Sequence, residues 1–311
     1  MSGTERASQS PASPLFSIII TFHNQRRFIK DALDSALSQR DAEFEVVVID
    51  DASTDGSQEI LKEYGAAIRL VRLETNVGAC AARNRGAAAA VGEYLVFLDG
   101  DDALVPWALE VYNRIVQKKT PAFILASMAW FKETLPAAGK RPREMAIVDY
   151  DDYFGRDRGF GHSASAFVVA RRAFEEAGGW LVGFFPLEDV EFAMRLGVAG
   201  RTIQILEPPT IWHRAHPGNT VNDVASFMPP MEVLLRRERE GHFPGGAERR
   251  LERRALIGGF AAHWVKRAAK SGLRGKAAKL FVHSAPMVFA AVGSKVGRII
   301  GGRSRVEKIA M

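Results

Sequence analysis

Tyr94-Leu-Val-Phe-Leu98 runs directly into Asp99-Gly-Asp-Asp102, so that an apolar segment ends in three carboxylates. A short run rich in aromatic and β-branched residues is typical of a buried strand. Carboxylates placed together beside a core repel one another, so a positive group is expected to compensate them. A divalent cation that binds oxygen ligands and phosphates is one candidate. A solvated Asp-Gly turn is the alternative for this stretch taken alone.

Strands and helices are predicted to alternate around this stretch. Apolar runs predict the strands, and apolar residues at helical spacing predict the segments between them. The order predicts an α/β fold with a mostly parallel sheet flanked by helices. The expected strands are Phe16–Thr21, Glu45–Asp50, Ile68–Leu73, Tyr94–Leu98, Phe123–Ala129, Ser165–Ala170 and Arg201–Leu206, and the expected helices are Phe28–Leu37, Ser57–Tyr64, Ala79–Ala90 and Pro186–Leu196.

Polar groups follow three of the first four predicted strands. Parallel strands place their carboxyl ends at one edge of the sheet, where ligands of such folds bind. One acidic strand end is an ordinary turn, but three polar ends at one edge predict a binding site. These groups are Thr21 with His23 and Asn24, Asp50 with Asp51, and Asp99 with Asp101.

The size and composition are ordinary for a globular protein. A chain of 311 residues is long enough for one large α/β domain with an appendage. A single cysteine, Cys80, forms neither an internal disulfide nor a thiolate metal site, which fits a reducing compartment. The polar first 14 residues predict no signal peptide, and the absence of about 18 uninterrupted apolar residues predicts no membrane-spanning helix.

The net charge of +6 is unevenly distributed. Residues 230–311 hold 18 Lys and Arg against 6 Asp and Glu, a balance of +12, which leaves about −6 for residues 1–229. We therefore expect three parts: a disordered segment over residues 1–14, an α/β domain over 15–226, and a basic helical region over 227–311. A basic tail suggests contact with anionic lipid headgroups or nucleic acid.

The motifs together resemble family 2 glycosyltransferases of the GT-A fold, which invert the anomeric centre and use nucleotide-diphosphate sugars. The similarity extends from about residue 14 to residue 220. Each motif is weak alone, and their order and spacing carry the resemblance. They are Ser17-Ile-Ile-Ile-Thr21-Phe-His-Asn24, Val48-Ile-Asp50-Asp51-Ala-Ser53-Thr-Asp55, Asn76-Val-Gly78, Ala82-Arg83-Asn84-Arg-Gly86, Gly92 to Asp102, Gly178-Gly179-Trp180, Glu188-Asp189 and Arg214-Ala-His216.

The resemblance implies a role for each motif. The donor-binding residues would be Thr21 and Asn24 against the nucleotide, Asp51 on the pyrimidine N–H, Arg83 on the base or phosphates, and Asp99 near the ribose. Asp101 would ligate a divalent cation, Mn²⁺ or Mg²⁺, with His216 as an additional metal or phosphate contact. Asp189 would be the general base, with Gly179, Trp180 and Glu188 near the acceptor or the sugar.

Elementary chemistry agrees with these roles and leaves alternatives open. A cation on the diphosphate improves the leaving group, and one carboxylate suffices to deprotonate an attacking hydroxyl. If the family resemblance is set aside, Glu188-Asp189 is interpreted as the acidic first turn of a helix. Arg83 is then interpreted as the ion-pair partner of an acidic residue. Trp180 is either a core residue or an acceptor platform, and His216 either a ligand or a loop histidine. His23 replaces an aromatic residue that is frequent in the family.

The C-terminal region mixes basic and apolar residues. Leu251–Lys270 and Leu280–Val292 are predicted helices, with Trp264 and Phe260 among the cations of the first. Such helices suit a peripheral membrane contact, and packing on the catalytic domain is the equal alternative. No nucleic-acid-binding fold is recognised.

The resemblance implies a metal-dependent inverting glycosyltransferase, with a uridine diphosphate sugar as donor and a glycan or lipid-linked hydroxyl as acceptor. We expect it in the cytoplasm, at the inner face of the membrane, in bacterial-type polysaccharide, glycan or glycolipid assembly. One alternative is a nucleotidyltransferase, which would need a glycine-rich loop after the first strand, where Thr21 to Arg27 holds no glycine. Another is a non-catalytic sugar- or nucleotide-binding scaffold.

Overall fold

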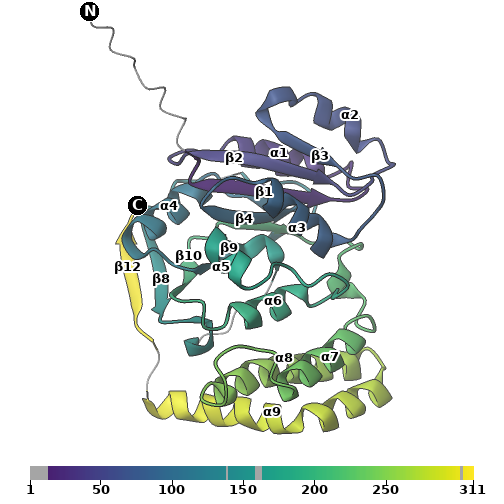
Figure 1. Ribbon diagram of the computed structural model, residues 1–311, viewed down its shortest axis with the longest axis vertical. Helices are drawn as coiled ribbons and strands as arrows, with labels where there is room; N and C mark the ends of the chain where they lie inside the picture. Colours follow the sequence, from purple (N-terminus) through teal and green to yellow (C-terminus); the bar gives the residue numbers. More distant parts are fainter. Residues whose placement is uncertain (1–12, 138, 158–162, 302–303) are drawn as a thin grey trace, which may run out of the picture.

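The computed structural model describes residues 13–137, 139–157, 163–301 and 304–311, with the side chains of 295–301 left undescribed (Figure 1). The predicted disordered segment, residues 1–14, lies almost wholly outside the described residues.

The predicted parallel sheet is present. Its strands are β1 (Phe16–Phe22), β2 (Phe44–Asp50), β3 (Arg69–Arg72) and β4 (Tyr94–Asp99). β1 pairs in parallel with β2 and β4, and β2 pairs in parallel with β3. All seven residues of β1 are buried, as expected for a strand covered on both faces. The carboxyl ends of β1, β2 and β4 therefore lie side by side, as the sequence predicts.

The sheet continues with strands of mixed direction. These are β6 (Phe123–Leu125), β8 (Glu144–Tyr150), β9 (Phe167–Ala170), β10 (Thr202–Glu207) and β12 (Val306–Ala310). The full strand order is β12-β8-β10-β6-β9-β4-β1-β2-β3. β9 runs antiparallel between β4 and β6. β12 adds the last residues of the chain to the edge of this sheet, beside β8, a return that the helical character of the C-terminal region did not predict.

The prediction of one strand over Phe123–Ala129 is wrong. The segment divides into β6 and β7 (Met128–Phe131), which belong to different sheets. The division falls at Ala126 and Ser127, where the Ala126 N–H donates to Ala166 and the Ser127 carbonyl accepts from Thr210. β7 joins β11 (Ile211–Arg214) and β5 (Ala103–Leu104) in a small sheet. β5 starts directly after the Asp99–Asp102 stretch, so the small sheet flanks the acidic strand end.

Helices cover both faces of the large sheet. α1 (Ile29–Leu37) and α4 (Ala108–Lys119) pack with Ile18 and Val48 on one face, and Leu61 of α2 (Ser57–Lys62) joins them. α3 (Ala79–Ala89), α5 (Arg171–Glu176) and α6 (Glu188–Leu196) pack with Ile19 and Val47 on the other. Single 3-10 turns occur at Gly65–Ala67, Tyr153–Gly155, Ala164–Ala166 and Thr220–Asn222.

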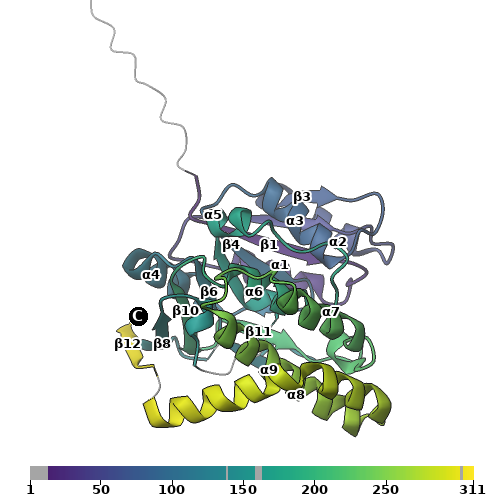
Figure 2. The same ribbon diagram turned by 60° about the horizontal axis from the view of Figure 1, so that its bottom comes forward.

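The C-terminal region forms a helical layer. This layer packs against the apolar cluster that contains α3, α5 and α6. α7 (Met228–Arg239), α8 (Arg250–Lys270) and α9 (Arg274–Gly301) lie beyond α6 in both views (Figures 1 and 2). α8 and α9 cross closely at Gly258, where an added Cβ would lie 1.9 Å from the carbonyl oxygen of Met287. Trp264, Ile257 and Leu280 belong to the same apolar cluster as α3 and α6. The layer is therefore packed on the α/β domain.

α9 also has the length and composition of a helix that could cross a membrane. Over Arg274–Ser294 the mean hydropathy is 1.2, and 28% of the window is buried. The sequence criterion of uninterrupted apolar residues missed this helix because Lys276 and Lys279 lie near its start. Helices in the cores of soluble proteins share this length and composition.

Candidate active site

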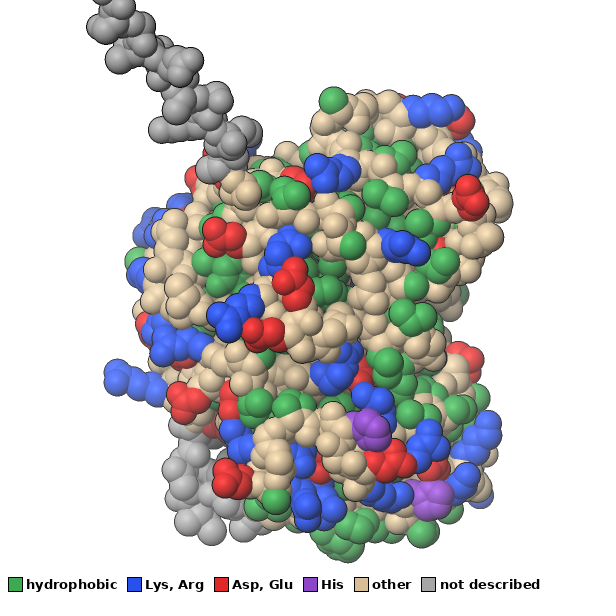
Figure 3. Space-filling model, in the orientation of Figure 1, with side chains coloured by type: hydrophobic (Ala, Val, Ile, Leu, Met, Phe, Trp, Pro, Cys, Tyr) green, Lys and Arg blue, Asp and Glu red, His purple; other side chains and the backbone are tan. Residues whose placement is uncertain are grey.

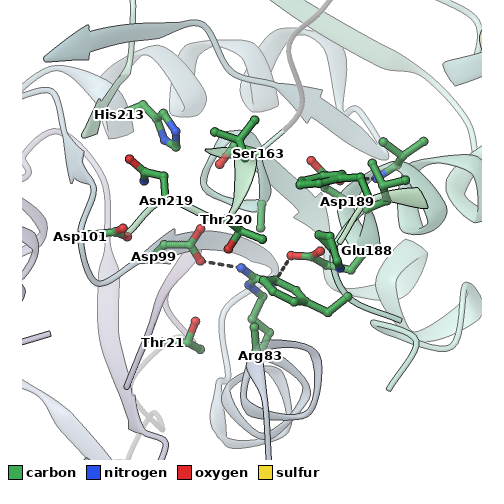
Figure 4. Close-up of a pocket in the computed structure, with 18 of the residues that line it drawn as sticks. Thr21, Arg83, Asp99, Asp101, Ser163, Glu188, Asp189, His213, Asn219 and Thr220 are labelled. Carbon is green, nitrogen blue, oxygen red and sulfur yellow. Dashed lines mark hydrogen bonds and ion pairs between the residues drawn. The ribbon is translucent and has the colours of Figure 1, made fainter. Parts of the chain in front are cut away.

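A cavity of about 920 Å³ opens at the carboxyl ends of the parallel strands. Its walls come from the ends of β1, β2 and β4, the first turns of α3 and α6, the segment after β11, and α8. Figure 4 labels ten of the lining residues, among them Arg83, Asp101 and Asp189. Among the predicted site residues, those that line it are Thr21, Asp51, Arg83, Asp99, Asp101, Glu188, Asp189 and His216. Asn24, Gly179 and Trp180 are not among the lining residues.

Arg83 links the acidic strand end to the start of α6. Its Nη2 donates to Asp99 Oδ1 at 2.6 Å, and its Nη1 donates to Glu188 Oε1 at 3.0 Å (Figure 4). The arginine is 3% exposed. Burial alone would lower the pKa of Arg83, but the charges of Asp99 and Glu188 outweigh it and raise that pKa. Arg83 is thus a fixed cation bonded to two acids.

Trp180 belongs to the core beneath this ion pair. It is 1% exposed and stacks on Phe167 with ring centroids 5.8 Å apart. The Arg83 guanidinium lies 5.0 Å from the centre of its ring. Of the two readings of Trp180, the structure therefore favours the core residue. Gly179 forms the tight turn before it, with φ +66°, and an added Cβ would lie 2.7 Å from Oδ1 of Asn84.

Glu188 and Asp189 begin α6 and have different surroundings. Leu187, just before them, has a left-handed backbone with φ 81°, a conformation that is costly for a branched side chain. Glu188 faces Arg83, and burial raises its pKa against the effect of that cation. Asp189 lines the cavity, and its Oδ1 accepts from the Val190 N–H at 2.7 Å. Burial and then the charge of Glu188 raise the pKa of Asp189 to about 7.

Asp101 and His216 form a second pair in the cavity. His216 Nε2 donates to Asp101 Oδ2 at 2.9 Å, and Phe28 packs on the imidazole with ring centroids 4.9 Å apart. Burial, followed by the charges of Asp102 and Asp99, raises the pKa of Asp101 to about 6, although the bond from His216 opposes the shift. A carboxylate oxygen and an imidazole nitrogen therefore lie together, 115 residues apart in sequence.

The neighbouring Asp102 is buried, is not among the residues that line the cavity, and holds the small sheet. It accepts from the Arg214 N–H at 3.0 Å and from His213 Nδ1 at 2.9 Å. Arg214, 2% exposed, also donates through Nε to the Asp101 carbonyl at 2.9 Å. These bonds fix the segment that carries His216 against the strand end that carries Asp101.

Asp101 could hold a divalent cation that shares its shell with substrate, and His216 could join it through Nε2 once that nitrogen gives up the proton it shares with Asp101. Magnesium sites on phosphate substrates use one or two protein carboxylates, and phosphate and water oxygens complete the shell. Sites with nitrogen and oxygen ligands also bind Mn²⁺, with lower affinity than the later first-row metals. No group of three or more His, Cys, Asp or Glu able to hold a metal occurs in the described parts of the chain. With Asp101 and His216 as its protein ligands, the cation would take most of its coordination shell from substrate and water oxygens.

Side chains that follow β1 and β2 accept hydrogen bonds from backbone N–H groups of neighbouring loops. Both carboxylate oxygens of Asp51 accept backbone N–H groups, from Val77 at 2.8 Å and from Gly78 at 2.9 Å. Asn24 accepts from the Thr54 N–H at 2.8 Å, which explains its place outside the cavity lining. Thr21 and Asp51 remain at the cavity wall.

Several residues that line the cavity were not predicted as site residues. His213 had no role assigned from the sequence, and it lines the cavity. Trp130 contacts the His213 ring edge-on, with ring centroids 4.4 Å apart. Trp130 is 62% exposed, and no sequence signal separates it from a core tryptophan. Asn219 and Thr220 line the cavity after His216, and one face of α8 closes it. These contacts join distant segments, so local patterns do not reveal them.

Comparison with known proteins gives matches at the levels of family, sequence and fold. The model of "Glycosyl transferase family 2" matches residues 17–178. The "Putative teichuronic acid biosynthesis glycosyltransferase TuaG" of Bacillus subtilis is 38% identical over 142 residues, which cover 45% of this chain and 56% of TuaG. The chain thus spans about half the length of this curated relative.

Two solved structures share the fold. S. aureus TarS 1-349 in complex with UDP matches with a TM-score of 0.61 and 19% identity, covering 79% of this chain and 70% of that one. The mannosyltransferase PcManGT from Pyrobaculum calidifontis, in complex with GDP-Man and Mn²⁺, matches with a TM-score of 0.54 and 19% identity, covering 91% and 87%. At these identities the likeness shows the fold, and it confirms the predicted GT-A-like architecture.

Replacing Arg83 by methionine should destabilise the fold in a pH-dependent way. The change leaves the buried Glu188 and the partly buried Asp99 without their cation, and removing one partner of a buried ion pair costs about 3–5 kcal/mol of unfolding free energy. Burial already raises the pKa of Glu188, so Glu188 takes up a proton in the folded variant as the pH falls. Because the folded state then binds more protons than the unfolded state, the loss should be larger at pH 8 than at pH 5.5. Urea denaturation at both pH values measures it.

The control is Arg172→Met, which removes an exposed ion pair with Glu176 and should cost less than about 1 kcal/mol. A loss for Arg83→Met as small as that of the control, or equal at both pH values, would contradict the bridging role of Arg83.

Proposed function

The chain belongs to glycosyl transferase family 2, and we propose that it is a metal-dependent inverting glycosyltransferase. The proposed donor is a nucleotide-diphosphate sugar, with UDP as the expected nucleotide, and the acceptor is a hydroxyl group. The observation that carries this proposal is the single cavity in which the Asp101–His216 pair and Asp189 face the same space. A leaving-group site and a base are both needed for glycosyl transfer.

We assign the diphosphate end of the donor to Asp101 and His216. A divalent cation held by these two side chains would neutralise the charge that develops on the departing diphosphate. Thr21, Asp51 and Asp99 are the proposed donor contacts, because all three line the same cavity as Asp101 and His216. Arg83 acts there through Asp99, to which it is bonded. Asn24 acts through the loop that it holds at Thr54.

Asp189 is the proposed general base. The acceptor oxygen forms a bond to the anomeric carbon while the bond from that carbon to the diphosphate oxygen breaks, and the hydroxyl proton passes to the carboxylate. Attack on the face opposite the leaving group inverts the anomeric centre, so one base is enough. Burial that raises the pKa of Asp189 to about 7 makes it a stronger base than an exposed aspartate. Glu188 keeps Arg83 in place beside it.

The proposed setting is the assembly of a bacterial polysaccharide, glycan or glycolipid in the cytoplasm. The support is the printed name of TuaG, which refers to teichuronic acid biosynthesis. The acceptor in such assembly is a glycan or a lipid-linked sugar.

We also propose a peripheral membrane contact through α9. Four of its apolar side chains are exposed, Phe281 by 47%, Val282 by 68%, Phe289 by 71% and Val292 by 55%. At 100° per residue they fall within an arc of about 100°. Figure 3 shows apolar atoms beside Lys and Arg along the lower edge, where α9 lies. Residues 274–301 contain five Lys and Arg and no Asp or Glu, so the matching partner is an anionic bilayer surface.

Changing Asp189 to asparagine should remove transfer and spare donor binding. Loss of a general base lowers the rate by about 10²–10⁴-fold. Because the carboxylate is the active form and its pKa is raised to about 7, kcat/KM of the unaltered protein should rise tenfold per pH unit below that value and level off above it. Product formation and calorimetric binding of the donor with Mn²⁺ measure both effects. Glu175→Gln, an exposed carboxylate on α5, is the control. Retained transfer in Asp189→Asn, or lost donor binding, would rule out this role.

The membrane contact predicts co-sedimentation with vesicles that contain phosphatidylglycerol and weaker binding to neutral phosphatidylcholine. Replacing Phe281 and Phe289 together by serine should reduce the bound fraction at least tenfold, since two apolar side chains no longer enter the interface. Leu70→Ser, an exposed residue of β3 at the other end of the molecule, should have no effect. Equal binding to both vesicle types, or unchanged binding of the double variant, would count against the contact.

A further inference from the structure

One face of α8 forms a wall of the active-site cavity. Residues at intervals of four along this helix share a face. Two adjacent rows of this kind line the cavity: Ala255, Gly259, His263 and Arg267 in one, and Leu256, Phe260 and Trp264 in the other. The same cavity holds Asp101 and Asp189, so the wall is continuous with the proposed catalytic groups.

This wall is apolar where the opposite wall is charged. Leu256 and Phe260 are half-buried and line it. Trp264 and Phe227 stack with ring centroids 3.8 Å apart and an interplanar angle of 15°. Val221 adds a further apolar lining group. Sugar hydroxyls and phosphates need hydrogen-bonding or charged partners, so this part of the cavity does not suit either.

The polar groups on the α8 wall are compatible with an apolar ligand. Arg267 donates through Nη2 to the Val221 carbonyl at 2.7 Å, and its guanidinium lies 4.8 Å from the centre of the Trp264 ring. Burial, and then the charges of Arg267 and Lys266, lower the pKa of His263. The lowered pKa favours the neutral imidazole. No acidic residue of α8 is among the described lining residues.

Gly259 leaves room along this wall. A Cβ added at Gly259 would meet no atom within 4 Å, whereas one added at the adjacent Gly258 would lie 1.9 Å from the Met287 carbonyl oxygen. Gly258 is thus required for the crossing of α8 and α9. Gly259 faces open space on the cavity side, where a larger side chain fits without displacing the helix.

We infer that the α8 wall is an acceptor subsite that binds an apolar chain. The acceptor is then amphiphilic: its hydroxyl reaches Asp189 while its chain lies along Leu256, Gly259 and Phe260. This inference rests on the proposed function and narrows its acceptor to a lipid-linked class. Continuity of the apolar wall with the catalytic cavity is the observation that places the chain there rather than on the exposed face of α9.

The test is binding of n-alkyl β-D-glucosides, from methyl to octyl and below their micellar concentrations, to the full chain with UDP and Mn²⁺ present. Each methylene buried on the α8 wall should strengthen binding by up to about fourfold. Calorimetry should therefore show octyl glucoside binding at least tenfold tighter than methyl glucoside. Gly259→Leu fills the subsite and should abolish this gain, while Gly275→Leu, an exposed helical glycine with open space around it, should keep it.

Binding of UDP with Mn²⁺ to the same three proteins separates the two proposals. Intact nucleotide binding with a chain-length effect that Gly259→Leu removes supports the subsite. Intact nucleotide binding without a chain-length effect, or with one that persists in Gly259→Leu, overturns the subsite and leaves the proposed function standing. A chain-length effect in a protein that binds no nucleotide overturns the acceptor assignment, and the missing nucleotide binding overturns the proposed function.

Discussion

The double ion pair of Arg83 is the interaction on which the arrangement of the site depends. One guanidinium joins the end of β4, through Asp99, to the start of α6, through Glu188, which is 105 residues from Arg83 along the chain. Burying the charges of Arg83 and Glu188, with Asp99 partly buried beside them, is costly unless each has a partner in good geometry, and the Trp180 ring beneath the guanidinium supports that geometry. The bridge brings the first turn of α6 to the acidic strand end, and with it Asp189. A proposed metal-binding carboxylate and a proposed base thus occupy one cavity.

Much of this arrangement could be predicted from the sequence. Strand–helix alternation and polar residues after three strands indicated the parallel sheet and the edge at which the cavity lies, because parallel strands have their carboxyl ends on the same side. The Asp99–Asp102 stretch was predicted to need a compensating positive group, and Arg83 supplies one at Asp99. The alternative interpretation of Arg83, as the partner of an acidic residue, agrees with its bonds to Asp99 and Glu188 in the structure. The assignment of Asp101 to a cation and of Asp189 to a base stays a proposal.

The remaining features depend on contacts between distant segments. Trp180 is 1% exposed in the core and Trp130 is 62% exposed at the cavity, a difference that depends on how distant segments pack around each ring. The return of β12 to the sheet edge and the closure of the cavity by α8 follow from how the C-terminal helices pack, which periodicity does not encode. α8 was predicted as a helix with Trp264 and Phe260 among its cations, but one of its apolar faces turns to the cavity. The site therefore has a charged wall that the sequence revealed and an apolar wall that it did not.

Binding of the donor at the acidic strand end is the central claim, and one measurement tests it most directly. The unfolding free energy is followed by thermal or urea denaturation for the full chain and for Asp101→Ala, across a panel of nucleotide sugars with and without Mn²⁺. A donor present at a hundred times its Kd should raise the unfolding free energy by about 2.7 kcal/mol. The account predicts this gain for a UDP-sugar only when Mn²⁺ is present, and its loss in Asp101→Ala. No gain with any nucleotide sugar, or an equal gain without the cation and in the variant, would contradict it.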